Sequence, residues 1–287
     1  MTETQRAWRE RISTLHPELV SQPVRLLGEG QNNDLVLSGE IVFRLRRYPG
    51  RDGSNAHEAA VLRAIAPHLP LAVPAPLDVA PDLLSYPLIP GEPLPRDRIP
   101  AQALPVVAAQ LGRFLWQLHH APFPAVLQDE RARFQPMREW EDLYERARAS
   151  VYPLLSAAAR RHVTRHFAAF FERQRRLEIA PAVIHGDFGA GNILWEAREA
   201  REAQVTGVID FSSAGVGDPA VDLAAASTIA PDLLDALGAT YPGIAGVAGR
   251  IDFYRGTFLL QEALFGAETG DQDALSAGLQ GVEQQAR

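Results

Sequence analysis

The sequence predicts an α+β protein of two lobes, the first rich in β-strands and the second mainly helical. Three observations lead to this prediction. Short apolar runs separated by turn residues fill the first ninety positions, prolines and glycines then gather, and long amphipathic patterns dominate beyond residue 100. We place the boundary in a connector that begins near residue 90, so that residues 1–90 form the first lobe and residues 91–287 the second.

The first lobe contains runs of apolar and β-branched residues, which strands favour. Turn residues such as Gly28 and Gly39 separate these runs, and a later stretch repeats apolar residues at helical spacing. A Pro-Gly-Glu-Pro segment then changes the chain direction. The pattern predicts strands over residues 24–27, 35–37 and 41–45, a helix over residues 56–66, a strand pair within residues 78–89, and the connector at residues 90–93.

The second lobe is dominated by amphipathic patterns with Arg-rich outer faces. Asp218 followed by Pro219 has the signature of a helix amino terminus. The pattern predicts helices over residues 104–120, 137–150, 156–177, 219–227, 244–266 and 273–285.

One motif in the second lobe indicates chemistry. His185-Gly186-Asp187-Phe188-Gly189-Ala190-Gly191-Asn192 follows a short apolar run, and Ile209-Asp210-Phe211 begins seventeen residues after Asn192. Apolar runs on either side predict a β-hairpin that carries Asn192 and Asp210. In phosphoryl transfer, one carboxylate orients a hydroxyl nucleophile, while an Asn and a second carboxylate hold Mg²⁺ against the nucleotide phosphates. This layout is typical of kinase-type phosphotransferases.

Composition excludes several other classes of protein. With 46% hydrophobic and 22% charged residues the chain can bury a sizeable core. It has no cysteine, which excludes disulfide scaffolds, thiol catalysis and zinc–thiolate sites. The charged amino terminus lacks a secretory pattern, and no apolar run is long enough to span a bilayer. We therefore expect a soluble, cytoplasmic protein with no membrane partner.

Charge is distributed unevenly along the chain. All 28 basic residues are Arg, and the formal net charge is −7. From residue 203 onward eleven acidic residues face three Arg, a balance that repels nucleic acid and attracts cations. No nucleic-acid or protein partner is implied, and a small cationic partner would suit this half of the chain.

Nearly the whole chain resembles the aminoglycoside phosphotransferase family of small-molecule kinases, whose fold is protein-kinase-like. Motifs in the family's order carry the resemblance. They are LGEGQNN (27–33), IVFRL (41–45), HEAAVLRAI (57–65), YPLIPGEPL (86–94), LGRFLWQLH (111–119), VIHGDFGAGNIL (183–194), GVIDFSSAGVGDPAVDLA (207–224) and FLLQEALFGAETGD (258–271).

The resemblance implies a role for each residue of the motif. Asp187 would be the catalytic base, and Asn192 and Asp210 would bind Mg²⁺. Arg44 stands where the family has a phosphate-binding Lys, with Glu58 as its carboxylate partner. Because Arg is a planar fork rather than a compact ammonium, this substitution leaves nucleotide binding plausible and puts the turnover rate in question.

The remaining nucleotide contacts are also implied by the resemblance. A turn over the phosphates would contain Gly28, Gly30, Asn32 and Asn33, since Gly and Asn tolerate the backbone geometry of such loops. In the connector, the Pro87 carbonyl and the Ile89 N–H would contact the base of ATP or GTP. His185 is expected to hold the loop, and Asp222 to brace it.

The acceptor is expected to be a small molecule. Gly189 stands where protein kinases carry a Lys, and Gly217-Asp218-Pro219 follows Phe211 too closely for an activation loop. An ATP- or GTP-dependent phosphotransferase acting on an aminoglycoside hydroxyl is the leading reading. A macrolide, choline, homoserine or ketosamine kinase remains open, as does a nucleotide-binding protein with little turnover. Candidates for binding ammonium groups of the acceptor are Asp252, Glu262 and Glu268.

Overall fold

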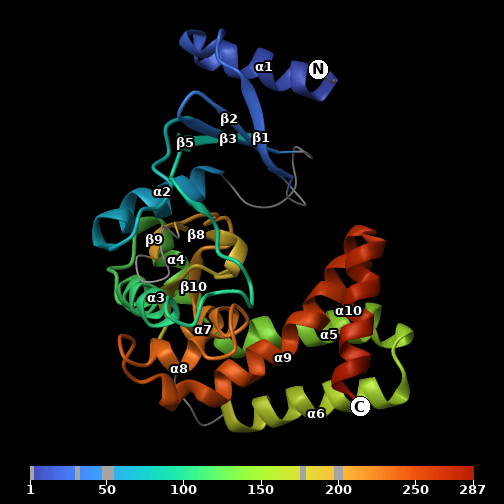
Figure 1. The fold of residues 1–287 in the computed structure, drawn as a ribbon. Helices are drawn as coiled ribbons and strands as arrows, with labels where there is room; N and C mark the ends of the chain where they lie inside the picture. The colour runs from blue at the N-terminus through green and yellow to red at the C-terminus, as the bar shows by residue number, and fades with distance from the viewer. Residues whose placement is uncertain (1–2, 30–32, 47–54, 175–178, 197–202) are drawn as a thin grey trace.

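The computed structural model describes residues 3–29, 33–46, 55–174, 179–196 and 203–287. A small lobe built on a β-sheet stands on a larger lobe made mainly of helices (Figure 1). The predicted α+β class with two lobes is confirmed. The boundary at residue 90 stays a prediction.

An antiparallel five-stranded sheet forms the small lobe, in the order β1-β2-β3-β5-β4. Each predicted strand run falls within one of its members. These are β1 (Val24–Glu29), β2 (Asn33–Ser38), β3 (Ile41–Arg46), β4 (Val79–Ala80) and β5 (Leu83–Pro87).

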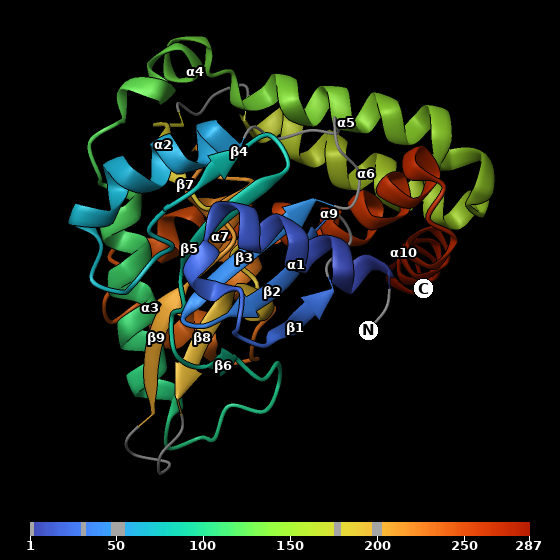
Figure 2. The same ribbon diagram turned by 90° about the horizontal axis from the view of Figure 1, so that it is seen from above.

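A helix covers each face of this sheet. Helix α1 (Glu3–Leu15) lies across β1, β2 and β3, where Ile12 packs with Phe43 (Figure 2). On the other side Val42 packs with Ala59 of α2 (Asn55–Ile65), close to the predicted bounds of that helix. Because side chains alternate along a strand, Arg44 shares the face of Val42 and is directed toward α2.

Helix α1 is an element that the sequence prediction missed. Its residues are mostly charged or polar, and among its described side chains Trp8 and Ile12 pack against the sheet's hydrophobic cluster. With so few apolar residues the segment resembles a solvated stretch in sequence. The exposed apolar face of the sheet supplies the reason for the helix, because that face needs a cover.

The predicted helices of the large lobe are all present, and the described residues add two short ones. The last three residues of the helix predicted over 156–177 lie outside the described residues. The short ones, α4 and α8, were not predicted because a segment of five or six residues shows less than two turns of periodicity. The helices are α3 (Leu104–His119), α4 (Gln128–Arg133), α5 (Pro136–Ser150), α6 (Ala157–Gln174), α7 (Ala220–Ala226), α8 (Leu233–Leu237), α9 (Ile244–Thr269) and α10 (Gln272–Gln285).

Helix α9 runs past the predicted end at Gly266 because that glycine is a packing position. A Cβ atom there would lie 2.2 Å from the backbone nitrogen of Leu275 in α10. Gly266 therefore allows the two helices to approach closely. The helix ends instead at Thr269, and the next residue, Gly270, has a φ of 80°, the left-handed conformation common after helices.

Two small β-structures sit in the large lobe beneath the sheet. The predicted hairpin is formed by β8 (Ile193–Glu196) and β9 (Gln204–Val208), with β6 (Glu92–Pro93) on the outer side of β8. A separate pair joins β7 (Ala182–Ile184) to β10 (Gly215–Gly217). Residues 185–192, the catalytic loop, connect β7 to β8 and so link the two structures.

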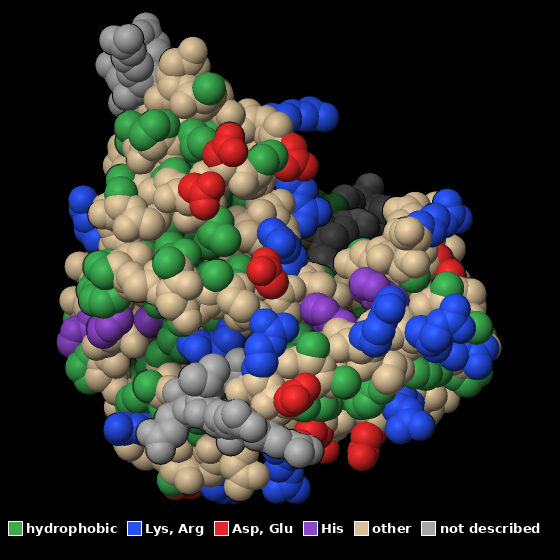
Figure 3. Space-filling model, turned by 90° about the horizontal axis from the view of Figure 1, so that it is seen from below, with side chains coloured by type: hydrophobic (Ala, Val, Ile, Leu, Met, Phe, Trp, Pro, Cys, Tyr) green, Lys and Arg blue, Asp and Glu red, His purple; other side chains and the backbone are tan. Residues whose placement is uncertain are grey.

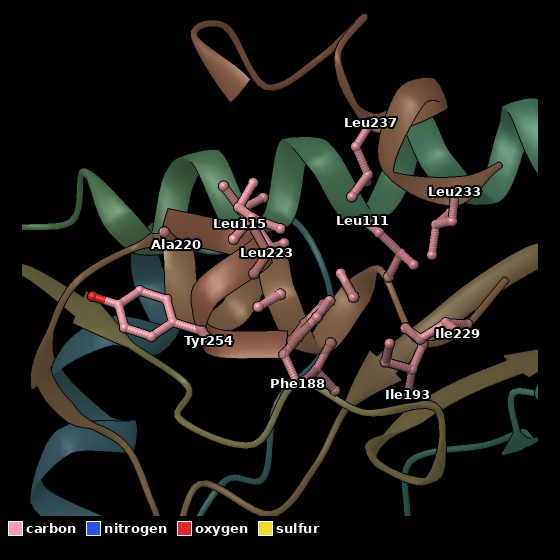
Figure 4. Packing of buried hydrophobic residues seen from close by; sticks show 14 of the residues in the cluster. Leu111, Leu115, Phe188, Ile193, Ala220, Leu223, Ile229, Leu233, Leu237 and Tyr254 are labelled. Carbon is pink, nitrogen blue, oxygen red and sulfur yellow. The ribbon is translucent and has the colours of Figure 1, made fainter. Parts of the chain in front are cut away.

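The largest hydrophobic core fills the large lobe and reaches the catalytic loop. Phe188 of that loop is fully buried and points into the core among residues from several helices (Figure 4). Its ring stacks on Phe114 of α3, with centroids 5.9 Å apart. Across the described ranges, no helix combines the length and the apolar character needed to cross a membrane.

Candidate active site

His185 connects the catalytic loop to the end of β9. The ring is buried, its Nδ1 accepts the N–H of Asp187 at 3.2 Å, and its Nε2 lies 3.0 Å from the carbonyl oxygen of Ile209. Because Nδ1 accepts a backbone hydrogen bond, the ring proton must lie on Nε2, which donates to Ile209. The imidazole thus holds the segments before Asp187 and Asp210 at a fixed separation.

Asp222 of α7 braces the same loop from below. Its carboxylate accepts the N–H of His185 at 2.7 Å and the N–H of Gly186 at 2.9 Å. It also accepts from Nε2 of His119 at 3.0 Å, and the other ring nitrogen of His119 lies 2.8 Å from the hydroxyl of Tyr241. Burial alone would raise the pKa of Asp222, but His119 and the His185 N–H hold it below its ordinary value. Asp222 is therefore a buried anion whose hydrogen-bond acceptors fix the start of the loop.

Gly186 is required by the geometry of this turn. Its φ is 81°, and a Cβ atom would lie 2.3 Å from the carbonyl oxygen of Ser213. Any other residue would both adopt an unfavourable backbone conformation and collide with the segment after Asp210.

Asp187 and Asn192 are joined directly. The amide nitrogen of Asn192 donates to the Asp187 carboxylate and to the Asp187 carbonyl, each at 2.9 Å. The nitrogen is thus used to orient Asp187, and the amide oxygen is the atom that could bind a cation.

Asp210, two residues after the end of β9, has a strained backbone. Its φ of 61° is left-handed, a conformation that non-glycine residues seldom adopt outside functional sites. One side-chain oxygen lies 3.4 Å from the N–H of Ser212 and 3.1 Å from Nη1 of Arg44. The side chain remains 38% exposed, so an additional ligand can reach it.

Arg44 and Glu58 form a buried pair. Both terminal nitrogens of Arg44 donate to the two carboxylate oxygens of Glu58. Burial alone would lower the pKa of Arg44, but Glu58 and Asp210 raise it above its ordinary value. Burial raises the pKa of Glu58, which Arg44 opposes. Because the guanidinium donates to both oxygens, we describe the pair as ionised.

These groups line one cavity between the lobes, which we call the interlobe cavity. Its volume is about 430 Å³. It brings together residues that are far apart in the sequence, namely Asn33, Arg44, Tyr86, Asp187, Asn192 and Asp210. The sequence prediction named all of them except Tyr86, whose ring closes the wall beside β3.

Other predicted nucleotide contacts lie elsewhere. Gly28 is in β1, with open space where a side chain would be, and Gly30 and Asn32 lie outside the described residues. Pro87 is exposed at the end of β5, and Ile89 is buried against Gly207 of the hairpin. Neither Pro87 nor Ile89 belongs to the described residues that line the interlobe cavity.

Two further pockets share Phe134 and Pro136, and the inner one reaches the catalytic loop. The inner pocket, of about 280 Å³, is lined by Gly186, Ser213 and side chains of α5 and α9 that include Glu139 and Gln261. The outer pocket, of about 570 Å³, runs along α5 and contains three exposed acids, Glu141, Asp142 and Glu145. Because Ser213 also lines the interlobe cavity, the inner pocket and that cavity meet beside Asp187.

The three acids predicted for an acceptor are not in these pockets. Asp252 pairs with Arg255 at 2.9 Å, and Glu268 pairs with Arg146 at 2.6 Å. Glu262 is exposed on α9. The prediction relied on the acidic second half of the chain and overlooked α5, because Arg residues there balance its acids. Only the fold shows that the acids at positions 139, 141, 142 and 145 of that helix border the pockets.

The brace at Asp222 predicts a pH-dependent stability. Asp222→Asn should lower the free energy of unfolding at pH 7 by about 3 kcal/mol, because one carboxylate acceptor becomes a donor facing buried N–H groups. A lowered pKa stabilises the fold above the unfolded value near 3.8 and loses that effect as the pH falls through the folded value. The difference in the free energy of unfolding between wild type and variant, measured by urea unfolding, should therefore shrink below pH 4. A gap that stays constant down to pH 2.5 would contradict this account, and the exposed Asp252→Asn is the control expected to change little.

The comparisons with known proteins agree with this geometry. Residues 23–250 match the model of the phosphotransferase enzyme family. The chain is 32% identical to the viomycin phosphotransferase of Streptomyces vinaceus over 295 residues, covering 94% of this chain and 99% of that one.

Solved structures show the same fold. The GDP complex of an aminoglycoside 2'-phosphotransferase-IIIa superposes with a TM-score of 0.86 at 21% identity, covering 99% of both chains. A macrolide 2'-phosphotransferase of Brachybacterium faecium gives a TM-score of 0.70 at 22% identity, covering 95% of this chain and 96% of that one. With a family model that spans most of its length, the chain belongs to the phosphotransferase enzyme family.

Proposed function

We propose that this protein transfers the γ-phosphate of a nucleoside triphosphate to a hydroxyl group of a small cationic molecule. The observation that carries the proposal is the interlobe cavity, which places Arg44, Asp187, Asn192 and Asp210 around one space. This set supplies the positive charge, the base and the oxygen ligands that phosphoryl transfer requires.

Asp187 acts on the acceptor hydroxyl. Asn192 holds one carboxylate oxygen of Asp187, and the bond from the Asp187 N–H to His185 fixes the backbone beneath it. The carboxylate is therefore oriented before the acceptor arrives. It accepts a hydrogen bond from the hydroxyl and directs the oxygen at the γ-phosphorus. It takes the proton as the new P–O bond forms and the P–O bond to the β-phosphate breaks, which releases the nucleoside diphosphate.

Arg44 binds the phosphates of the donor. Its charge is maintained by Glu58, and its Nη1 already faces the cavity through Asp210. Asn33 lies on the same wall, beside the turn that we propose lies over the phosphates with Gly28, Gly30 and Asn32. The Pro87 carbonyl and the Ile89 N–H stay proposed contacts of the base. Relatives with GDP and ADP bound support a nucleotide donor, and either ATP or GTP fits this proposal.

Asn192 and Asp210 suit Mg²⁺. Both offer oxygen atoms, which this hard cation prefers, and both line the cavity where the phosphates would lie. Among the described residues no group of three or more His, Cys, Asp or Glu could hold a metal ion alone. That agrees with Mg²⁺, which usually takes few protein ligands and completes its shell with phosphate oxygens and water. When bound, the ion would neutralise charge that develops on the transferred phosphoryl group.

The acceptor binds in the inner and outer pockets. The acids of α5 give these pockets a negative charge, whereas α6 carries exposed Arg160, Arg161 and Arg165. Basic and acidic side chains both appear on the face seen from below (Figure 3). A cationic acceptor is therefore attracted to the acids of α5. The relative named for viomycin, and the structural neighbour solved with kanamycin, support an antibiotic as the acceptor.

The base assignment gives a first prediction. Asp187→Asn should lower kcat for nucleoside diphosphate release by about 10²-fold or more, because the amide cannot take the hydroxyl proton. Its affinity for ADP in the presence of Mg²⁺ should change little. Exposed Asp235→Asn in α8 is the matched control. Near-full turnover of Asp187→Asn with viomycin or kanamycin would disprove the assignment.

The metal assignment gives a second prediction. Calorimetry should show that ADP binds more tightly with Mg²⁺ than without, and Asp210→Ala should remove most of that difference, because the carboxylate oxygen is a ligand. Asp218→Asn is unsuitable as a control because Asp218 is buried with Tyr254 and Arg250, so Asp235→Asn serves again. Equal affinity of the wild type with and without Mg²⁺ would argue against a metal at this site.

The acceptor pocket gives a third prediction. The triple variant Glu141→Gln, Asp142→Asn and Glu145→Gln should raise KM for viomycin about tenfold at low ionic strength, and added salt should reduce this effect. Turnover at saturation should be nearly unchanged. The control carries the same change in charge at Asp252, Glu262 and Glu268. If the control rather than the α5 variant raises KM, the acceptor lies where the sequence alone placed it.

A further inference from the structure

Arg44 has more hydrogen-bond donors than a single carboxylate can satisfy. A guanidinium carries five N–H groups, and this one is only 5% exposed. Nη1 donates to Glu58 and Asp210, and Nη2 donates to Glu58 and to Oδ1 of Asn55 at 3.2 Å. In the described structure the buried Nε has no partner. All four terminal hydrogens are therefore in use before a nucleotide binds.

This count limits how Arg44 can reach a phosphate. Asp210 lines the interlobe cavity with Arg44, whereas Asn55 and Glu58 are buried in α2. A phosphate in the cavity can therefore replace only Asp210 on Nη1, and in doing so it frees the Asp210 oxygen. The other three hydrogen bonds must keep the plane of the guanidinium in place during the exchange.

Asn55 differs from the other two partners of Arg44. Glu58 and Asp210 were predicted as site residues, and Asp210 lines the cavity, whereas Asn55 was not predicted and does not line it. Asn55 is 2% exposed and is the first residue of α2. Its Nδ2 donates to the carbonyl oxygen of Ala80 in β4 at 2.8 Å, which turns Oδ1 toward Arg44. The same Oδ1 lies 3.5 Å from Nη2 of Arg46, a longer contact than the one to Arg44. A lysine ammonium could be satisfied by Glu58 and a phosphate, but the second terminal nitrogen of an arginine needs its own acceptor.

We propose that Asn55 is a positioning residue for Arg44, the partner that allows an arginine to bind the donor phosphates in this protein. Without it, Nη2 keeps only its bond to Glu58, and the guanidinium can tilt away from the cavity. This inference rests on the proposed role of Arg44 in nucleotide binding.

A double-mutant cycle tests the proposal, with ADP affinity in the presence of Mg²⁺ measured by calorimetry. Asn55→Ala should weaken binding about tenfold in the wild-type background, the effect of losing a hydrogen bond to a charged group. In an Arg44→Lys background the same change should weaken binding less than about twofold, because the ammonium has no second nitrogen to hold. An equal loss in both backgrounds, or no loss in the first, would overturn the proposal.

Two variants separate positioning from stability. Asn55→Asp keeps the oxygen that faces Arg44 and loses the bond to Ala80. Its ADP affinity should therefore be close to that of the wild type and well above that of Asn55→Ala. A loss as large as that of Asn55→Ala would show that the Ala80 contact is what matters. Val61→Ala, in the fully buried part of α2, should lower the thermal midpoint without weakening ADP binding. If Asn55→Ala is unfolded, Asn55→Ser, whose hydroxyl cannot reach both partners, takes its place in the cycle.

The result also distinguishes this inference from the proposed function. Arg44→Ala should weaken ADP binding more than Asn55→Ala does. If Arg44→Ala binds ADP as the wild type does, the assigned role of Arg44 fails. If Arg44→Ala binds weakly while Asn55→Ala binds normally, Arg44 keeps its role and only the positioning by Asn55 is wrong.

Discussion

A buried guanidinium joins the two lobes of this protein. Arg44 extends from the middle of the sheet, is held by Glu58 of α2, and contacts Asp210 at the end of the hairpin in the other lobe. Removing charges from water is expensive, and such a pair is tolerated only when its hydrogen bonds are nearly complete. Here Glu58, Asn55 and Asp210 accept from both terminal nitrogens, so the same contacts that stabilise a buried charge also fix the wall of the interlobe cavity. The position of α2 is thereby linked to the geometry of the site.

The floor of the cavity is fixed by a second buried charge. Asp222 accepts two consecutive backbone N–H groups at the start of the catalytic loop, and Phe188 inserts its ring into the core directly after Asp187. Asp187 itself therefore lies between two anchors that have no chemical role. This arrangement keeps the carboxylate oriented at the cavity and limits its movement, as the role proposed for Asp187 requires.

The backbone has unusual conformations where the lobes meet. Asp210 is left-handed, as Asp97 is elsewhere in the described structure, and Gly186 opposite it has no room for a side chain. Both features lie between the catalytic loop and the segment after β9, which His185 ties together. The packed core below offsets the energy of the Asp210 backbone. The side chain of Asp210 stays partly exposed and pairs with Arg44, which another ligand could replace.

The sequence by itself determined the two-lobed α+β plan, the hairpin, and the grouping of Asp187, Asn192 and Asp210, while the family resemblance added Arg44 and Glu58. Periodic apolar patterns and fixed motif spacings are local signals, and they survive without knowledge of the fold. Helix α1 escaped prediction because it is mostly polar, and the short helices because their periodic signal is brief.

Tertiary structure alone decided which other side chains meet this set. Asn55 contacts Arg44 directly, whereas His119 contacts Asp222 below the catalytic loop and Tyr241 contacts His119. No local pattern in the sequence marks such partners. The same holds for the acids of α5, which resemble an ordinary solvated helix face in sequence, whereas Asp252 and Glu268 lie in ion pairs of their own. Helix packing determines which face of a helix borders a pocket, and packing depends on the complete set of long-range contacts rather than on any single segment.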